Sequence, residues 1–281
     1  MKRIIVNEHF KSLETFLDTM EKRPLNTAFK GKTNLSSQRL DETAWSGTNT
    51  YKEAIDVLKI GYKDPLQKMK KAILKIGEND KNARPRMRND FIGFTPNVPN
   101  TLMNLPITMI NREKVTPKTK TIHLTYSFCA SSVTRTSDLI KGGINFISLV
   151  NSLEKQDYRV KIDAIFSTME NRTISTFTVN LKEYDQQINL LKLAFPLVHP
   201  GMLRRFAFKW LETTPDLKET AFQRGYGKPL SYVMNDNLKK ERLFLEENGI
   251  LKGKNSYYCN VYTALRAYDV KELAEQMEIV K

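Results

Sequence analysis

The period of the apolar residues changes twice between residues 121 and 166, and this change most limits the possible folds. Apolar side chains alternate over 121–128, recur at helical spacing over 137–155, and alternate again over 159–166. This order predicts a strand, a helix and a second strand. A unit of this kind crosses over in the right-handed sense, so the two strands should be parallel neighbours in one sheet. The sequence therefore predicts an α/β fold.

Further patterns predict the elements around this unit. The helix over 137–155 should pack across the sheet through Ile140, Ile144 and Ile147, which share one helical face. Residues 173–181 should form another strand, antiparallel to its predecessor. Helices are expected over 9–22, 51–60, 65–77, 185–194, 200–212, 236–247 and 269–280, and a hairpin is expected over 251–265.

Residues 79–118 do not follow either period. Five prolines interrupt the segment, yet it carries too many apolar side chains for a free linker. We expect an extended segment wrapped on the core, and irregular segments of this length are often functional. The chain then divides into a basic helical and extended amino-terminal region, residues 1–118, and an α/β core with carboxy-terminal helices, residues 119–281.

The charge of the chain is its most informative bulk property. The formal net charge is +14, and residues 1–120 hold 23 Lys and Arg against 13 Asp and Glu, whereas residues 121–281 hold 22 against 18. A cationic excess on this scale favours a polyanionic partner. A lysine-rich solvated surface without such a partner is the alternative.

Two classes of protein are disfavoured. No apolar run reaches the roughly 18 residues that span a membrane, and the amino terminus lacks the apolar segment of a secretory signal. Cys129 and Cys259 are the only cysteines, so no disulfide framework is expected. A reducing cytoplasm is the expected compartment.

The first predicted strand runs into a loop rich in hydroxyl groups, within HLTYSFCASSVTRTSD at residues 123–138. The arrangement resembles the start of a von Willebrand factor A-like domain, where an Asp-x-Ser-x-Ser signature holds a divalent metal ion. Here the matching positions are Thr125, Ser127 and Cys129, so the aspartate is missing and no metal ion is expected. We expect hydroxyls to cap the helix that begins near Thr136, with phosphate binding at that helix start as the alternative.

Four segments resemble a family of uncharacterised tailed-phage proteins: WSGTNTYKEAIDVLKIG, FTPNVPNTLMNLPITMI, SSVTRTSDLIKGGINFISLVNSLEKQDYRV and HPGMLRRFAFKWLE. The resemblance spans roughly residues 45–230. It implies a Rossmann-like, von Willebrand factor A-like sheet with a decayed metal site, and a phage origin. In size and character the chain is also similar to the single-stranded-DNA-binding RNA polymerase cofactors of lytic podoviruses.

Residues 63–94 hold the clearest binding pattern, because nine lysines and arginines precede two aromatic side chains. Lysines at helical spacing and arginines that alternate along an extended segment both suit a phosphate backbone, and the aromatic rings could stack on unpaired bases. A second basic patch follows on the helix expected over 200–212. The candidate nucleic-acid-binding residues are Lys68, Lys71, Lys75, Arg84, Arg86, Arg88, Phe91, Phe94, Arg204, Arg205 and Lys209. The alternatives are a solvated lysine face and phenylalanines in the core.

No catalytic pattern accompanies these residues. His9, His123 and His199 are scattered without ligand spacing, and we expect His199 to have a capping or packing role. We therefore predict a non-enzymatic nucleic-acid-binding protein without a cofactor. It should prefer single-stranded DNA, act in phage transcription or replication in the cytoplasm of an infected bacterium, and contact a phage polymerase or another phage protein. A virion-assembly or protein-interaction module is the alternative.

Overall fold

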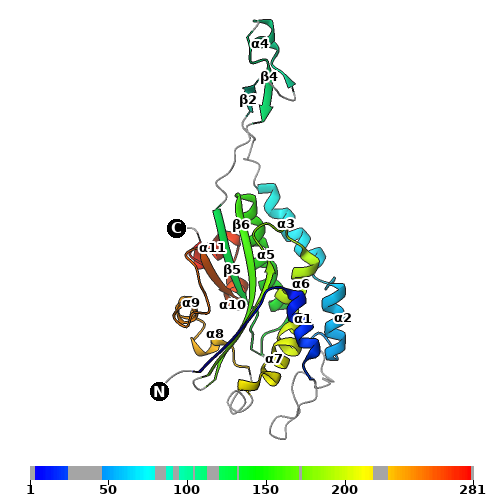
Figure 1. Cartoon of the computed structure of the whole chain (residues 1–281), viewed down its shortest axis with the longest axis vertical. Coiled ribbons are helices and arrows are strands. Elements are labelled where there is room, and N and C mark those ends of the chain that lie inside the picture. The colour runs from blue at the N-terminus through cyan, green and yellow to red at the C-terminus, as the bar shows by residue number, and fades with distance from the viewer. Residues whose placement is uncertain are drawn as a thin grey trace. The chain divides into compact units, whose positions relative to one another are not determined.

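The structure, a computed structural model, describes residues 4–24, 46–79, 87–90, 95–103, 105–112, 120–131, 133–170, 173–217 and 227–279. The chain forms two compact units (Figure 1). The larger unit combines residues 1–73 with residues 120–281, and the smaller one comprises residues 74–119.

A mostly parallel sheet lies at the centre of the larger unit (Figure 1). Its strands follow the order β1-β7-β6-β5-β8, and only β6 and β7 pair in the antiparallel sense. The strands are β1 (Ile4–Phe10), β5 (Lys120–Ser127), β6 (Tyr158–Glu170), β7 (Thr173–Lys182) and β8 (Ser256–Asn260). The predicted α/β fold is confirmed.

The predicted strand–helix–strand unit is also confirmed. β5 and β6 are parallel neighbours, and α5 (Thr136–Lys155) connects them. Ile147 is buried as expected, but Ile140 and Ile144 are only half-buried. The buried face of α5 is rotated toward Leu139, Phe146, Leu149, Val150 and Leu153. The strand after β6 is antiparallel to it, again as predicted.

The two faces of the sheet carry different layers (Figure 1). The face of Ile122 and Leu124, here called the helix-covered face, shares one core with the following helices. They are α1 (Leu13–Lys22), α2 (Tyr51–Ile60), α5, α6 (Leu190–Val198), the π-helical turn η1 (Met202–Ala207), α7 (Phe208–Thr213), α10 (Val261–Arg266) and α11 (Val270–Gln276). The opposite face is covered in part by α8 (Leu230–Val233) and α9 (Leu238–Glu247), which pack on Ile165, Ile174 and Tyr258.

The amino-terminal elements belong to the same unit as the core. β1 pairs with β7 as an edge strand, and α1 buries Phe16 and Met20 in the main core. The division expected at residue 118 therefore differs from the observed one. The helix expected over 9–22 begins only at Leu13, because Phe10 ends β1 and the Ser12 side chain caps α1 by accepting a hydrogen bond from the Thr15 N–H.

The prediction of a hairpin over 251–265 was wrong. β8 pairs with β5 in parallel, and the chain then turns into α10. The reason is Asn260, whose side chain accepts the Thr263 N–H and starts a helix where a hairpin needs a second strand. The helix expected over 185–194 lies at α6, whose amino end is capped by Asn189.

The smaller unit contains a three-stranded antiparallel sheet with the order β2-β4-β3. Its elements are β2 (Met87–Asp90), β3 (Thr95–Pro96), α4 (Val98–Leu102) and β4 (Met109–Arg112), and α3 (Leu66–Asn79) leads into it. The expectation of an extended segment wrapped on the core was wrong, because these residues make their own sheet. The periods were missed because strands of two to four residues are too short to show alternation.

Candidate functional site

Helix α3 exposes the lysines that the sequence pattern singled out. Lys68 and Lys71 are exposed, as is Lys70 between them, while Met69 is fully buried on the opposite side of the helix. In the part of the chain that the structure describes, the ion pairs involve other lysines, such as Lys59 with Glu21. The three α3 cations therefore face solvent without a neutralising carboxylate among the described residues.

The structure describes the other candidate binding residues of the segment 63–94 only in part. Arg84, Arg86, Phe91 and Phe94 lie outside the described residues, and so do the side chains of Lys75 and Arg88. The backbone of Arg88 lies in β2, where it pairs with Asn111. The role of the segment 63–94 in nucleic-acid binding stays a prediction.

The prediction that Arg205 and Lys209 belong to a second basic surface patch was wrong. Arg205 is fully buried, and its Nη2 donates to the carbonyl oxygens of Thr48 at 2.8 Å and Asn49 at 2.9 Å. Lys209 is 1% exposed, donates to the Met20 carbonyl and lies 4.2 Å from the centre of the Tyr51 ring. Burial lowers the pKa of Lys209 to about 8.

The reason for this error is that the helix over 200–213 is buried almost all round. Only Arg204 and Thr213 are half-buried, and the Arg204 guanidinium lies 5.4 Å from the Phe208 ring. Periodicity separates an inner from an outer face only where one face meets solvent. The cations here instead satisfy backbone carbonyls and fix residues 46–50 and α1 to the core.

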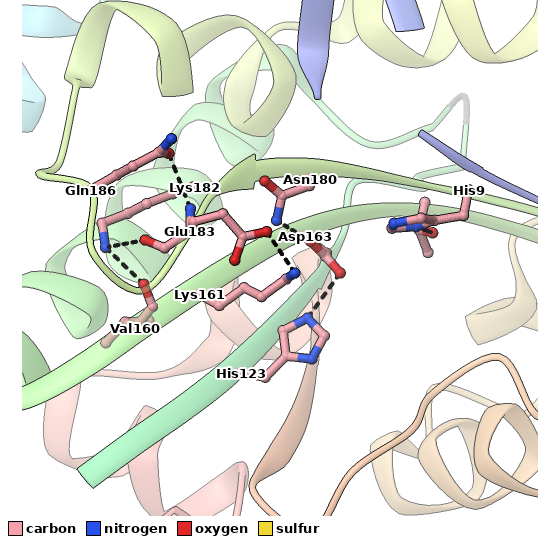
Figure 2. A network of polar contacts seen from close by, with 10 residues as sticks. His9, His123, Val160, Lys161, Asp163, Asn180, Lys182, Glu183 and Gln186 are labelled. Atoms are coloured by element: carbon pink, nitrogen blue, oxygen red, sulfur yellow. Dashed lines mark hydrogen bonds and ion pairs between the residues drawn. The ribbon is translucent and has the colours of Figure 1, made fainter. Parts of the chain in front are cut away.

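A polar network that the sequence reading missed covers the face of the sheet opposite the helix-covered face, here called the polar face (Figure 2). His123 on β5 donates through Nε2 to Asp163 on β6 at 2.8 Å, and Asn180 on β7 donates to the other oxygen of Asp163 at 2.9 Å. Burial raises the pKa of Asp163, but these hydrogen bonds together hold it below its ordinary value. Asp163 is therefore a buried carboxylate that orients the imidazole.

Two lysines on the neighbouring strands β6 and β7 make further polar contacts (Figure 2). Lys161 pairs with Glu183 at 2.7 Å, and Lys182 is buried, where it donates to the Val160 carbonyl at 2.7 Å and pairs with Glu154 of α5 at 2.6 Å. These contacts join β6, β7 and the end of α5. They support a structural role for this corner of the sheet.

His123 lies between Asp163 and Ser256, which raises the question of a catalytic triad. Ser256 is the register partner of His123 on β8, so both side chains lie on the polar face. In the described structure, however, the Ser256 hydroxyl is buried without a hydrogen-bond partner, and no bond joins it to His123. A nucleophile needs both a base within reach and access to substrate, and Ser256 has neither.

The carboxyl ends of β5 and β8 do not form the crevice in which doubly wound sheets hold ligands, because α5 and α10, which follow these strands, both lie on the helix-covered face. Side chains of the protein form a hydrogen-bonded cluster at the end of β8. Glu241 of α9 is fully buried and accepts hydrogen bonds from the Tyr258 hydroxyl at 2.9 Å and from Asn260 at 2.7 Å. Burial raises the pKa of Glu241 to about 7.

The hydroxyl-rich loop after β5 is also held by side chains of the protein. The Tyr262 hydroxyl accepts the Ser131 N–H at 2.7 Å and lies 3.2 Å from the Thr134 hydroxyl. The helix begins at Thr136 as predicted, but its N-cap residue is Arg135, which makes no side-chain cap. The expected hydroxyl cap was therefore wrong at that position, and the Ser131 N–H already has a partner.

A groove of about 490 Å³ lies between α1, α2 and the start of α6. Leu13, Leu17 and Leu58 line it, and an ion pair between Glu14 and Lys192 at 2.9 Å joins α1 to α6 at its edge. Its lining combines these apolar side chains with the charged side chains of Asp18 and Lys59.

The described residues contain no group of three or more His, Cys, Asp or Glu side chains that could hold a metal ion. His199 has the packing role expected of it, because its ring stacks on Phe195 and its Nδ1 accepts the Gly201 N–H at 2.9 Å. Burial lowers the pKa of His199 to about 4, so the ring is neutral at pH 7. No helix in the described ranges is long and apolar enough to cross a membrane.

Comparison with known proteins identifies a family and no individual relative. No curated protein and no solved structure matches the chain. The model of the domain of unknown function DUF7192 matches residues 2–272, which is nearly the whole sequence. The chain belongs to the DUF7192 family.

Proposed function

We propose that the protein binds nucleic acid without catalysing a reaction, and that it prefers single-stranded DNA. The observation that carries the proposal is the run of Lys68, Lys70 and Lys71, three exposed cations without a partner carboxylate among the described residues. Cations spaced along a helix release counterions when they meet a phosphate backbone, which is the main source of affinity in such binding. The net charge of +14 points to the same class of partner.

The buried cluster of Glu241, Tyr258 and Asn260 at the end of β8 favours a binding role for the exposed surface. Counted from β5, the strands β7-β6-β5-β8 follow the order 3-2-1-4 of doubly wound sheets, with the third strand reversed. We propose that this sheet is Rossmann-like in the von Willebrand factor A manner, with a first loop that has lost its metal ion. From the resemblance to tailed-phage proteins we further propose that it acts in phage transcription or replication in the host cytoplasm, with a phage polymerase or another phage protein as a further partner.

The test is a salt-dependent binding measurement on a charge-reversed variant. Lys68→Glu, Lys70→Glu and Lys71→Glu together should remove about three phosphate contacts, because all three side chains are exposed. The slope of log affinity against log salt for an oligothymidine should then become shallower by about 2, since each contact to a single strand contributes about 0.7. Affinity should fall for every sequence alike.

A matched control reverses three exposed lysines elsewhere. Lys52→Glu, Lys141→Glu and Lys252→Glu change the net charge by the same amount on α2, on α5 and before β8. This control should keep most of the affinity and the slope of the unmodified protein. A folded α3 variant with the same affinity and the same slope as the unmodified protein contradicts the proposal and leaves the protein-interaction or virion-assembly module as the better interpretation.

A further inference from the structure

The smaller unit presents a concentrated apolar surface, here called the apolar tip. Within ten residues of sequence, five large apolar side chains are exposed, whereas such side chains are scattered over the rest of the described chain. They are Val98 at 60%, Leu102 at 80%, Met103 at 70%, Leu105 at 44% and Ile107 at 36%. Clustered exposed apolar residues mark an interaction site more often than single ones do.

Hydrogen bonds fix the backbone of the tip. Asn97 caps α4, and its own N–H donates to the Thr108 carbonyl at 2.7 Å, which ties the start of α4 to the strand that returns. Asn100 donates through Nδ2 to the Ile107 carbonyl at 2.8 Å and accepts the Leu105 N–H on its carbonyl at 3.0 Å. The apolar side chains are therefore held outward on a folded turn, which lowers the entropy that a partner must overcome.

The charged residues of the smaller unit lie before and after the tip in the sequence. Residues 91–111 contain no Lys, Arg, Asp or Glu. The whole unit, residues 74–119, holds eight Lys and Arg against four Asp and Glu, a net charge of +4, and all of these residues lie on the flanking segments. A partner that matches this unit carries negative charge beside apolar faces.

Unpaired nucleic acid has this combination. A duplex presents phosphates but stacks its bases inward, whereas a single strand exposes the apolar faces of its bases next to its phosphates. We propose that the apolar tip contacts the exposed base faces of single-stranded nucleic acid, whose phosphates suit the net positive charge of this unit. This inference rests on the proposed function, and it names the part of the chain that separates single strands from duplex.

The test removes apolar surface and leaves the charge unchanged. Leu102→Gln with Met103→Gln should weaken oligothymidine binding at least about tenfold, because both substitutions remove apolar surface that would cover the base faces. Duplex affinity and the salt slope should stay as in the unmodified protein, because no cation is lost. The unfolding temperature without DNA should not change, because both side chains are exposed. Leu191→Gln with Leu243→Gln, two exposed leucines of the larger unit, is the matched control and should keep full affinity.

Four outcomes overturn the inference, and a separate one bears on the proposed function. The inference fails if the unmodified protein binds DNA and the tip variant binds oligothymidine equally well, or if the variant loses single-strand and duplex affinity alike. It also fails if the variant lowers the unfolding temperature of the free protein, which would mean that the tip packs on its own chain. Loss of binding to phosphatidylserine vesicles with unchanged DNA affinity assigns the tip to a lipid surface and equally defeats it. If the unmodified protein binds neither oligothymidine nor duplex, the proposed function itself fails.

Discussion

Replacing Glu241 by glutamine should stabilise the protein at neutral and alkaline pH and leave its stability in acid unchanged. The Glu241 carboxyl is fully buried, and its pKa is raised from 4.5 to about 7 because burial disfavours the charged form. Between these two values the folded protein keeps a proton that the unfolded chain has released. The folded state therefore binds more protons, and the free energy of unfolding must fall as the pH rises.

The size of this effect follows from the two pKa values. The difference between 4.5 and about 7 corresponds to about 3 kcal/mol, because one pKa unit is about 1.4 kcal/mol. Glutamine mimics the neutral carboxyl: its oxygen can accept from Asn260, and its amide can donate to the Tyr258 hydroxyl. The free energy of unfolding of the variant should therefore not fall with pH in this way, and it should exceed that of the unmodified protein by about 3 kcal/mol at pH 8.

The assay is chemical unfolding of both proteins from pH 4 to pH 8. The difference between their free energies of unfolding should be small below pH 4.5 and should increase toward pH 7. Glu247→Gln, an exposed carboxyl on the same helix, is the control and should show no such increase. A difference between Glu241→Gln and the unmodified protein that is the same at pH 5 and at pH 8 would refute the reasoning.

Three further predictions concern His199, Lys209 and the loop after β5. The pKa of His199 is lowered from 6.5 to about 4, so the free energy of unfolding should fall by about 3 kcal/mol as the pH drops from 6.5 to 4. The free energy of unfolding of His199→Gln, measured in parallel, should not show this fall. The pKa of Lys209 is lowered from 10.5 to about 8, so the free energy of unfolding should rise by about 2 kcal/mol between pH 8 and pH 10. Lys209→Met, unfolded in parallel, should not show this rise. Thr125 stands where the metal-binding signature needs an aspartate, so magnesium, manganese and calcium should leave the melting temperature unchanged, and a stoichiometric shift would contradict this.

The sequence predicted the part of the fold that depends on local patterns. β5, α5 and β6 follow one another along the chain, and each carries its own period over eight or more residues. The pairing of β1 with β7 joins segments 169 residues apart in the sequence, and no local pattern reports such a partner. Phe10 illustrates the ambiguity, because its spacing to Leu13 fits a helix although it ends a strand.

The contacts of the candidate site could likewise be predicted only as far as they depend on local patterns. His123 and Thr125 stand at the polar positions of the alternation in β5, and Lys161 and Asp163 do so in β6, so a polar face could have been read from the sequence. The contact between His123 and Asp163 depends on the register of the two strands, which the alternation does not give. Arg205 and Lys209 failed for a different reason, since a helix that is buried all round has no outer face for its cations.

The buried cluster around Glu241 and the exposed groups of α3 and the apolar tip suit different roles. In a doubly wound sheet the carboxyl ends of the strands usually hold the ligand, but here Glu241, Tyr258 and Asn260 form a buried hydrogen-bonded cluster at the end of β8. Opening it to a ligand would expose a buried carboxyl and remove both of its donors. The α3 lysines and the apolar tip need no such rearrangement, because their side chains are already exposed. A partner that approaches either the α3 lysines or the apolar tip therefore meets a lower barrier than one that must enter the sheet.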